Sequence, residues 1–163
     1  MRIEMKRWLF DLAVWSLSLA TASVVLAREA RAGEEVFTAT NPKWKAECGS
    51  CHVAYPPQLL PRTSWRAIMA GLDKHFGTDA SLDDESVAEV GTFLEGHAAG
   101  ERGRAGGKPM LRITETRWFR QEHDEVPAST WKDKRVNSAA NCAACHTKAE
   151  GGDFSERTLR VPQ

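Results

Sequence analysis

Cys48-Gly49-Ser50-Cys51-His52 is one of two stretches in which two cysteines lie three positions apart and a histidine follows the second. The other is Cys142-Ala143-Ala144-Cys145-His146, and these two pentads contain all four cysteines of the 163-residue chain. On a helix the two thiols of a pentad lie about one turn apart, so they can bond both vinyl groups of one haem while the adjoining histidine binds the iron. The pattern predicts two covalently bound haem c groups, with His52 and His146 as iron ligands.

Cysteines and histidines at short spacing also occur in disulfide-bonded proteins and in zinc sites. A pair of disulfides leaves the histidine after each second cysteine without a role. Because the same five-residue pattern occurs twice and uses every cysteine, it favours haem attachment through Cys48 and Cys51 and through Cys142 and Cys145 over both alternatives.

The first 32 residues have the features of an export signal. Basic residues, an apolar run and a small-residue site follow one another: Arg2, Lys6 and Arg7, then Leu12 to Leu26, then Ala30-Arg31-Ala32. We expect cleavage between Ala32 and Gly33, a periplasmic protein and no stable membrane insertion after cleavage. Retention of the segment as a membrane anchor is the alternative, but the apolar run is short and interrupted by serine and threonine.

The chain after residue 32 is small and nearly neutral. It has 131 residues, with 17 basic and 19 acidic side chains and therefore a net charge of −2. This charge does not favour nucleic acid as a partner. We expect a monomer. A chain of this length buries little apolar surface, so the haems should supply much of the interior.

Turn residues and hydrophobic spacing predict an all-α fold with extensive loops. The expected helices are one from Asn41-Pro42 through the first pentad to Tyr55, one from Thr63 or Ser64 to about His75, one from Ser81 to about His97, one from Trp118 to His123, and one from Asn137 to Lys148. The Gly/Arg-rich residues 100–109 are expected to link two small haem-centred lobes, residues 33–99 and residues 110–163.

Each iron needs a second axial ligand, and the chain has three further histidines, His75, His97 and His123. Met69 and Met110 are the rival ligands after the signal. Met69 shares an apolar helix face with Trp65, which is typical of a core residue. Met110 lies in a loop beside a proline and remains an alternative.

The local sequence favours His75, which follows a helix end, and His123, which lies next to the aromatic pair Trp118-Phe119. The stripe of Val90 and Leu94 favours an inward orientation of His97, whereas its place at a helix end is more often that of a capped or solvent-touching histidine. His97 stays open as a replacement for His75. Ligation by two histidines leaves no open position on an iron and restricts it to one-electron exchange at low potential.

The chain after the signal resembles the small dihaem cytochromes c of proteobacteria, called DHC. The matching stretches are Glu47 to Pro61, Ser64-Trp65, His75-Phe76-Gly77, Arg112-Ile113-Thr114, Trp118-Phe119, His123, and Asn141 to His146. This resemblance implies a soluble periplasmic electron carrier, not an enzyme, with two low-spin haems in two lobes. It implies His52 and His75 on one iron and His146 and His123 on the other. It further implies electron donation to a small high-spin cytochrome c and reduction by a membrane b-type cytochrome.

Three other functions stay open from the sequence. A small dihaem subunit of a periplasmic nitrate reductase has a similar size and export signal, although the surroundings of its pentads differ. A dihaem peroxidase or a gas-binding cytochrome requires an iron with an open or displaceable ligand position.

Overall fold

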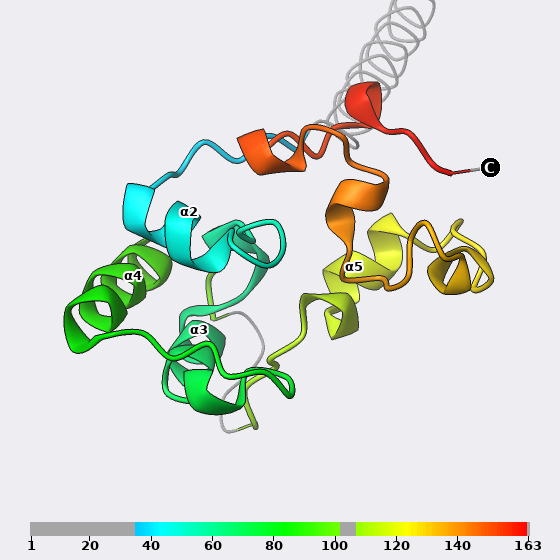
Figure 1. Ribbon diagram of the computed structural model, residues 1–163. Helices are drawn as coiled ribbons and strands as arrows, with labels where there is room; N and C mark the ends of the chain where they lie inside the picture. Colours follow the sequence, from blue (N-terminus) through cyan, green and yellow to red (C-terminus); the bar gives the residue numbers. More distant parts are fainter. Residues whose placement is uncertain (1–34, 102–106, 163) are drawn as a thin grey trace, which may run out of the picture. The chain divides into compact units, whose positions relative to one another are not determined.

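The computed structural model describes residues 35–101 and 107–162 (Figure 1). The predicted export signal and the middle of the predicted linker lie outside these residues. The residues from Val36 onward form one compact unit. Its described part consists of helices, single helical turns and loops, without a named strand, so the predicted all-α class with extensive loops is confirmed. The predicted lobe boundaries stay a prediction.

The α-helices of the described residues are short, and single turns of 3-10 helix separate them. The α-helices are α2 (Pro42–Cys48), α3 (Arg62–Met69), α4 (Asp84–His97) and α5 (Arg117–Glu122). The 3-10 turns are Pro57–Leu59, Leu72–Lys74, Ile113–Glu115, Thr130–Lys132, Cys142–Ala144, Ala149–Gly151 and Glu156–Thr158.

Side-chain caps fix where two of these helices begin. The Asn41 side chain accepts a hydrogen bond from the backbone N–H of Trp44 at 2.8 Å, which confirms the predicted start of α2. In α4 the cap is Asp83, whose carboxylate accepts from the backbone N–H of Ser86 at 2.9 Å. The predicted start at Ser81 was therefore too early, because Asp83 satisfies the free N–H groups of the first turn.

Both pentads contain less helix than predicted. Helix α2 ends at Cys48, and Gly49 turns so tightly that a Cβ there would clash with the carbonyl oxygen of Lys45. The predicted helix from Asn137 to Lys148 is wrong, since only the 3-10 turn Cys142–Ala144 forms within it. Asn137 has a left-handed backbone with φ 65°, a conformation that an α-helix does not contain.

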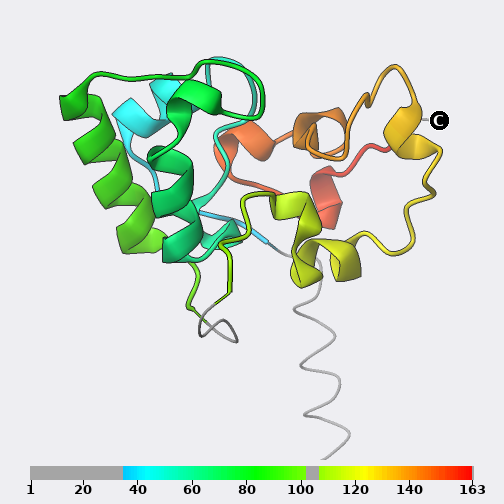
Figure 2. The same ribbon diagram turned by 90° about the horizontal axis from the view of Figure 1, so that it is seen from below.

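Helix α4 packs against α2 and α3, and these three helices gather into one group in Figures 1 and 2. The buried apolar side chains of this core are Trp44, Leu60, Trp65, Val90, Phe93 and Leu94. An ion pair of 2.6 Å between Arg66 and Glu95 joins α3 to α4 at the surface. Met69 packs half-buried against the same core, as predicted for a core residue and not for a ligand.

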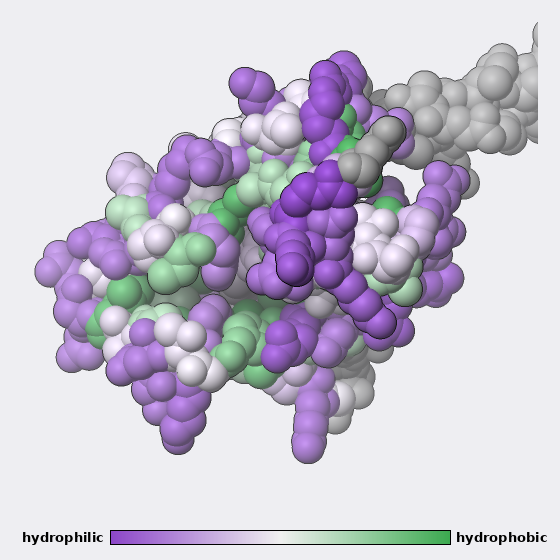
Figure 3. Space-filling model, turned by 45° about the vertical axis from the view of Figure 1, so that its right-hand side comes forward, coloured by the Kyte–Doolittle hydropathy of each residue, from purple (hydrophilic) through white to green (hydrophobic). Residues whose placement is uncertain are grey.

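The part of the chain after residue 107 has a much smaller polypeptide core. Its buried apolar side chains among the described residues are Phe119, Val136 and Ala149. So few residues bury little apolar surface, in accord with the expectation that bound haem supplies part of the interior. On the face drawn in Figure 3, hydrophobic side chains form small separate patches among hydrophilic ones.

Candidate functional site

The structure brings His52 and His75 together. Their ring centroids lie 6.3 Å apart, and the ring planes are inclined by 23°. His52 ends the first pentad in a loop, whereas His75 caps the 3-10 turn Leu72–Lys74. The two residues thus reach one another from separate elements, α2 and the chain that follows α3.

A tight turn holds His75 in place. Phe76 and Gly77 both have left-handed backbones, with φ of 49° and 98°, and the N–H of Thr78 donates to the carbonyl of His75 at 3.0 Å. A bulky residue in this conformation is strained, and such strain concentrates at functional sites. The Arg112 guanidinium lies 4.3 Å from the centroid of the Phe76 ring, a cation–π contact that stabilises the turn.

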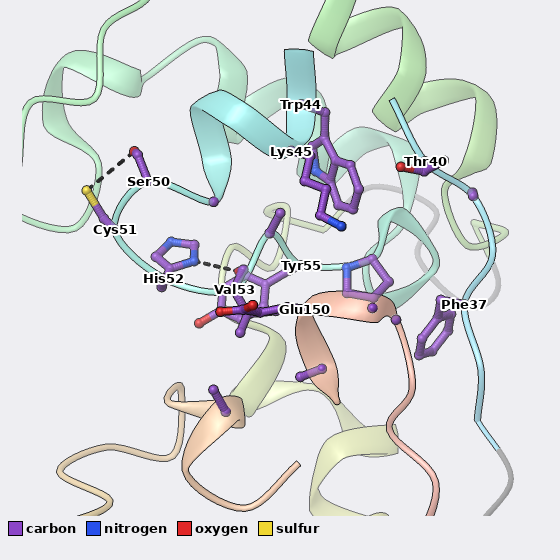
Figure 4. Close-up of a pocket in the computed structure, with 18 of the residues that line it drawn as sticks. Phe37, Thr40, Trp44, Lys45, Ser50, Cys51, His52, Val53, Tyr55 and Glu150 are labelled. Atoms are coloured by element: carbon purple, nitrogen blue, oxygen red, sulfur yellow. Dashed lines mark hydrogen bonds between the residues drawn. The ribbon is translucent and has the colours of Figure 1, made fainter. Parts of the chain in front are cut away.

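The orientation of His52 is set by its neighbours in the same loop (Figure 4). Its Nδ1 lies 2.8 Å from the carbonyl oxygen of Val53, and its ring stacks on Tyr55 at a centroid distance of 4.6 Å. A carbonyl oxygen only accepts hydrogen bonds, so Nδ1 carries the proton and Nε2 is left with a free lone pair. Such a nitrogen can bind a metal.

The second pair is His123 and His146. Their ring centroids lie 6.2 Å apart, with planes inclined by 72°. His123 follows the last residue of α5, and its Nδ1 lies 2.9 Å from the carbonyl oxygen of Phe119. The His123 ring also stacks on the Phe119 ring at 4.0 Å. As for His52, the bond to a backbone carbonyl leaves Nε2 free.

In each pair, the pKa of one histidine is lowered. Burial is the main cause of the lowered pKa of His75, and the neighbouring His52 lowers it further. Burial is also the main cause of the lowered pKa of His146, and the neighbouring His123 is the second cause. Both causes favour the neutral imidazole, which is the form that binds metals.

His97 lies apart from both pairs. It is the last residue of α4, its ring contacts Phe93 at a centroid distance of 4.8 Å, and no ring contact joins it to another histidine among the described residues. Its side chain is exposed, which agrees with a histidine at a helix end and not with an inward orientation. The apolar stripe of α4 ends with Leu94, and the last turn of the helix reaches solvent.

The four cysteines form no disulfide in the structure. Cys51 is exposed, whereas Cys48, Cys142 and Cys145 are half-buried. Burial raises the pKa of Cys48 and of Cys142 to about 11, so both are thiols before they bond to another group. No group of three His, Cys, Asp or Glu side chains in the described part of the chain is arranged to hold a metal ion.

The separation of each histidine pair fits one intervening iron. Metal–imidazole nitrogen bonds are about 2.0 Å long, so two imidazoles on opposite sides of one metal have ring centres roughly 6 Å apart. The observed 6.3 Å and 6.2 Å agree with this spacing. In both pairs one histidine directly follows the second cysteine of a pentad, as attachment of the same haem requires.

Comparisons with known proteins show which family the chain belongs to. A model of the dihaem cytochrome c family matches residues 44–154. The chain belongs to the dihaem cytochrome c family. A solved dihaem cytochrome c of Rhodobacter sphaeroides is 44% identical, with a TM-score of 0.65, over 72% of this chain and 99% of that one. One of Shewanella baltica is 43% identical, with a TM-score of 0.65, over 75% and 93%. No curated protein matches.

As a dihaem cytochrome c, the protein carries two covalently bound haem c groups and transfers electrons. The haem supplies a reversible one-electron couple at its iron, and the polypeptide supplies ligands, orientation and surroundings. The four cysteines of the two pentads fit the attachment of two haems. None of the helices that the structure describes has the length and apolar character needed to cross a membrane.

Several residues around the sites were not found from the sequence. The centroid of the Trp131 ring lies 6.0 Å from that of His123, eight positions away in the sequence. Phe37 donates its N–H to the carbonyl of Gly152 at 2.8 Å and packs its ring edge-on against Phe154, which contacts His146. These contacts join positions far apart in the chain, so no local pattern indicates them.

Proposed function

We propose that this cytochrome is an exported, periplasmic one-electron carrier with two low-spin haems, each held between two histidines. His52 and His75 bind the first iron, and His146 and His123 bind the second. The observation that carries this proposal is the presence of two histidine pairs with nearly equal ring separations, 6.3 Å and 6.2 Å.

Two nitrogen ligands occupy both axial positions of an iron, so peroxide, nitrate or a gas has no place to bind without displacing a histidine. The polypeptide around each pair resists such displacement. His123 is held by Phe119 through both a hydrogen bond and a ring stack, and His52 is held by Val53 and Tyr55. The protein therefore acts as a carrier and not as an enzyme.

The proposed partners are a small high-spin cytochrome c as electron acceptor and a membrane b-type cytochrome as donor. The ligands support electron transfer from this protein to the cytochrome c. An iron with two histidines lacks the methionine that raises the potential of many cytochromes c, and a low potential favours electron donation. The family membership supports a redox protein as partner in general, and the choice of these two rests on the resemblance of the sequence to DHC.

Stopped-flow mixing tests the proposal. The reduced protein should pass electrons rapidly to a small high-spin cytochrome c, and by itself should turn over neither peroxide nor nitrate. Peroxide turnover above roughly 1 per second, a rate typical of enzymes, would place the protein in the enzyme class instead.

A further inference from the structure

Tyr55 is the single tyrosine of the chain, and it contacts both haem-binding regions. Its ring stacks on that of His52, with centroids 4.6 Å apart and planes inclined by 19°. Its hydroxyl donates a hydrogen bond of 2.6 Å to the carbonyl oxygen of Ala140, which is 85 positions further along the chain. One side chain therefore connects a proposed iron ligand of the first haem with the approach to the second pentad.

The acceptor of this hydrogen bond is itself tied to the second haem-binding region. The backbone N–H of Cys142 donates to the same carbonyl oxygen of Ala140 at 3.0 Å, and the Cys142 thiol lies 3.7 Å from it. Cys142 is the first cysteine of the second pentad. Tyr55 and the first cysteine of the second pentad therefore donate to one shared acceptor, the carbonyl oxygen of Ala140.

Tyr55 also lies beside the space between the two pentads. A cavity of about 1060 Å³ adjoins it and is lined from both sides, by residues of the first pentad such as Cys51 and His52 and by Asn141 and Ala143 of the second region (Figure 4). The hydrogen bond from Tyr55 to Ala140 therefore joins the two regions directly, beside this cavity.

We propose that Tyr55 is a positioning residue that fixes the separation and orientation of the two haem sites and thereby sets the rate of electron exchange between them. This inference rests on the proposed function. The phenol stays protonated throughout, and no bond forms or breaks in the polypeptide. The ring orients His52 by stacking, and the hydroxyl anchors that ring to the second region.

Two variants separate the two contacts. Tyr55→Phe keeps the ring but removes the hydroxyl, so the low-spin signal of the first iron should stay unchanged while the inter-haem exchange rate falls about threefold or more, as loss of one well-made hydrogen bond loosens the arrangement. Tyr55→Leu should in addition change the low-spin signal of the first iron, because His52 loses its stacking partner.

Thr147→Val is the matched control. It removes a side-chain hydrogen bond of 2.8 Å to the carbonyl of Thr158 beside the second pentad, without connecting the two regions. Its exchange rate, measured by nuclear magnetic resonance of the half-reduced protein, should equal that of the wild type. The inference is overturned if Tyr55→Phe also exchanges at the wild-type rate, or if Thr147→Val slows exchange equally.

A measurement on the unaltered holoprotein keeps the test decisive if a variant does not fold. Because the chain has one tyrosine, isotope-labelled tyrosine gives one set of ring signals. These signals should shift upon oxidation of either iron, and the hydroxyl proton should exchange slowly with water. Signals that respond to one iron alone contradict the inference. A wild-type protein without two low-spin irons contradicts the proposed function itself, and is recognised before any variant is made.

Discussion

The His123 and His146 rings face one another at 6.2 Å with planes inclined by 72°, whereas the planes of His52 and His75, at 6.3 Å, are inclined by only 23°. Different neighbours cause this difference. His123 lies flat on the Phe119 ring, and His52 lies flat on the Tyr55 ring. Outer contacts of this kind fix the rotation of a metal-bound imidazole.

The oxidised protein should give two distinct low-spin signals in electron paramagnetic resonance. The angle between two axial imidazole planes sets the splitting of the iron d orbitals, so the near-parallel pair should give a rhombic signal and the near-perpendicular pair a strongly anisotropic one. Integration of the spectrum should count one iron of each kind. Two identical signals would contradict the geometry, and a high-spin signal would contradict the ligation.

Replacement of single histidines tests the ligand assignment. His75→Ala and His123→Ala should each vacate one iron, and each should produce a high-spin signal and carbon monoxide binding at one haem only. His97→Ala is the control, and both irons should remain low-spin because His97 is exposed and apart from the other histidines. If His97→Ala opens a haem while His75→Ala does not, the first ligand pair is misassigned.

The same substitution at two glycines should have opposite effects on stability. Gly77 has φ 98° in the turn after His75, so Gly77→Ala should lower the free energy of unfolding by about 1–2 kcal/mol. Gly91 lies inside α4 with open space where a Cβ would be, so Gly91→Ala should raise it by about 0.5–1 kcal/mol. Denaturant titrations of the holoproteins provide both values. If both substitutions changed the free energy of unfolding in the same direction, the left-handed turn at Gly77 would be contradicted.

Asp133→Asn should destabilise the protein in a pH-dependent way. Hydrogen bonds from the side chain and backbone of Arg135 lower the pKa of Asp133 to about 2. Because this pKa is below the 3.8 of an ordinary aspartate, the ionised carboxylate stabilises the fold at neutral pH. This contribution is fully present above pH 3.8 and is lost as the pH falls through about 2.

The midpoint of thermal unfolding should therefore be lower for Asp133→Asn at pH 7, and the difference from the wild type should shrink as the pH falls from 3.8 towards 2. Asp73→Asn is the matched control, because Asp73 forms only a loose surface ion pair of 3.7 Å with Lys74. A difference for Asp133→Asn that is independent of pH would exclude the ionised carboxylate as its cause.

Intact-mass measurement of the periplasmic protein tests export and haem attachment together. The expected chain begins near Gly33 and carries the mass of two haems, because the signal ends at Ala30-Arg31-Ala32 and each pentad binds one haem. A chain that retains residues 1–32, or that lacks the mass of one haem, contradicts this prediction.

The sequence alone determined the cofactor, the fold class, the start of α2 and the position of α5. Two pentads that use every cysteine indicate haem because the chemistry of attachment requires that spacing. The start of α2 follows from Asn41-Pro42, and α5 lies within one residue of its prediction. Such features depend on neighbours within about one helical turn, so a linear pattern contains them.

Only the tertiary structure decided which side chains surround each histidine pair. It separates His97 from the other histidines, brings Trp131 to the His123 ring, and joins Tyr55 to Ala140. It also shows that the second pentad lies on a 3-10 turn and loop instead of the predicted helix. These outcomes depend on contacts between distant positions and on the rotation of whole elements, which the spacing of residues along one segment does not specify.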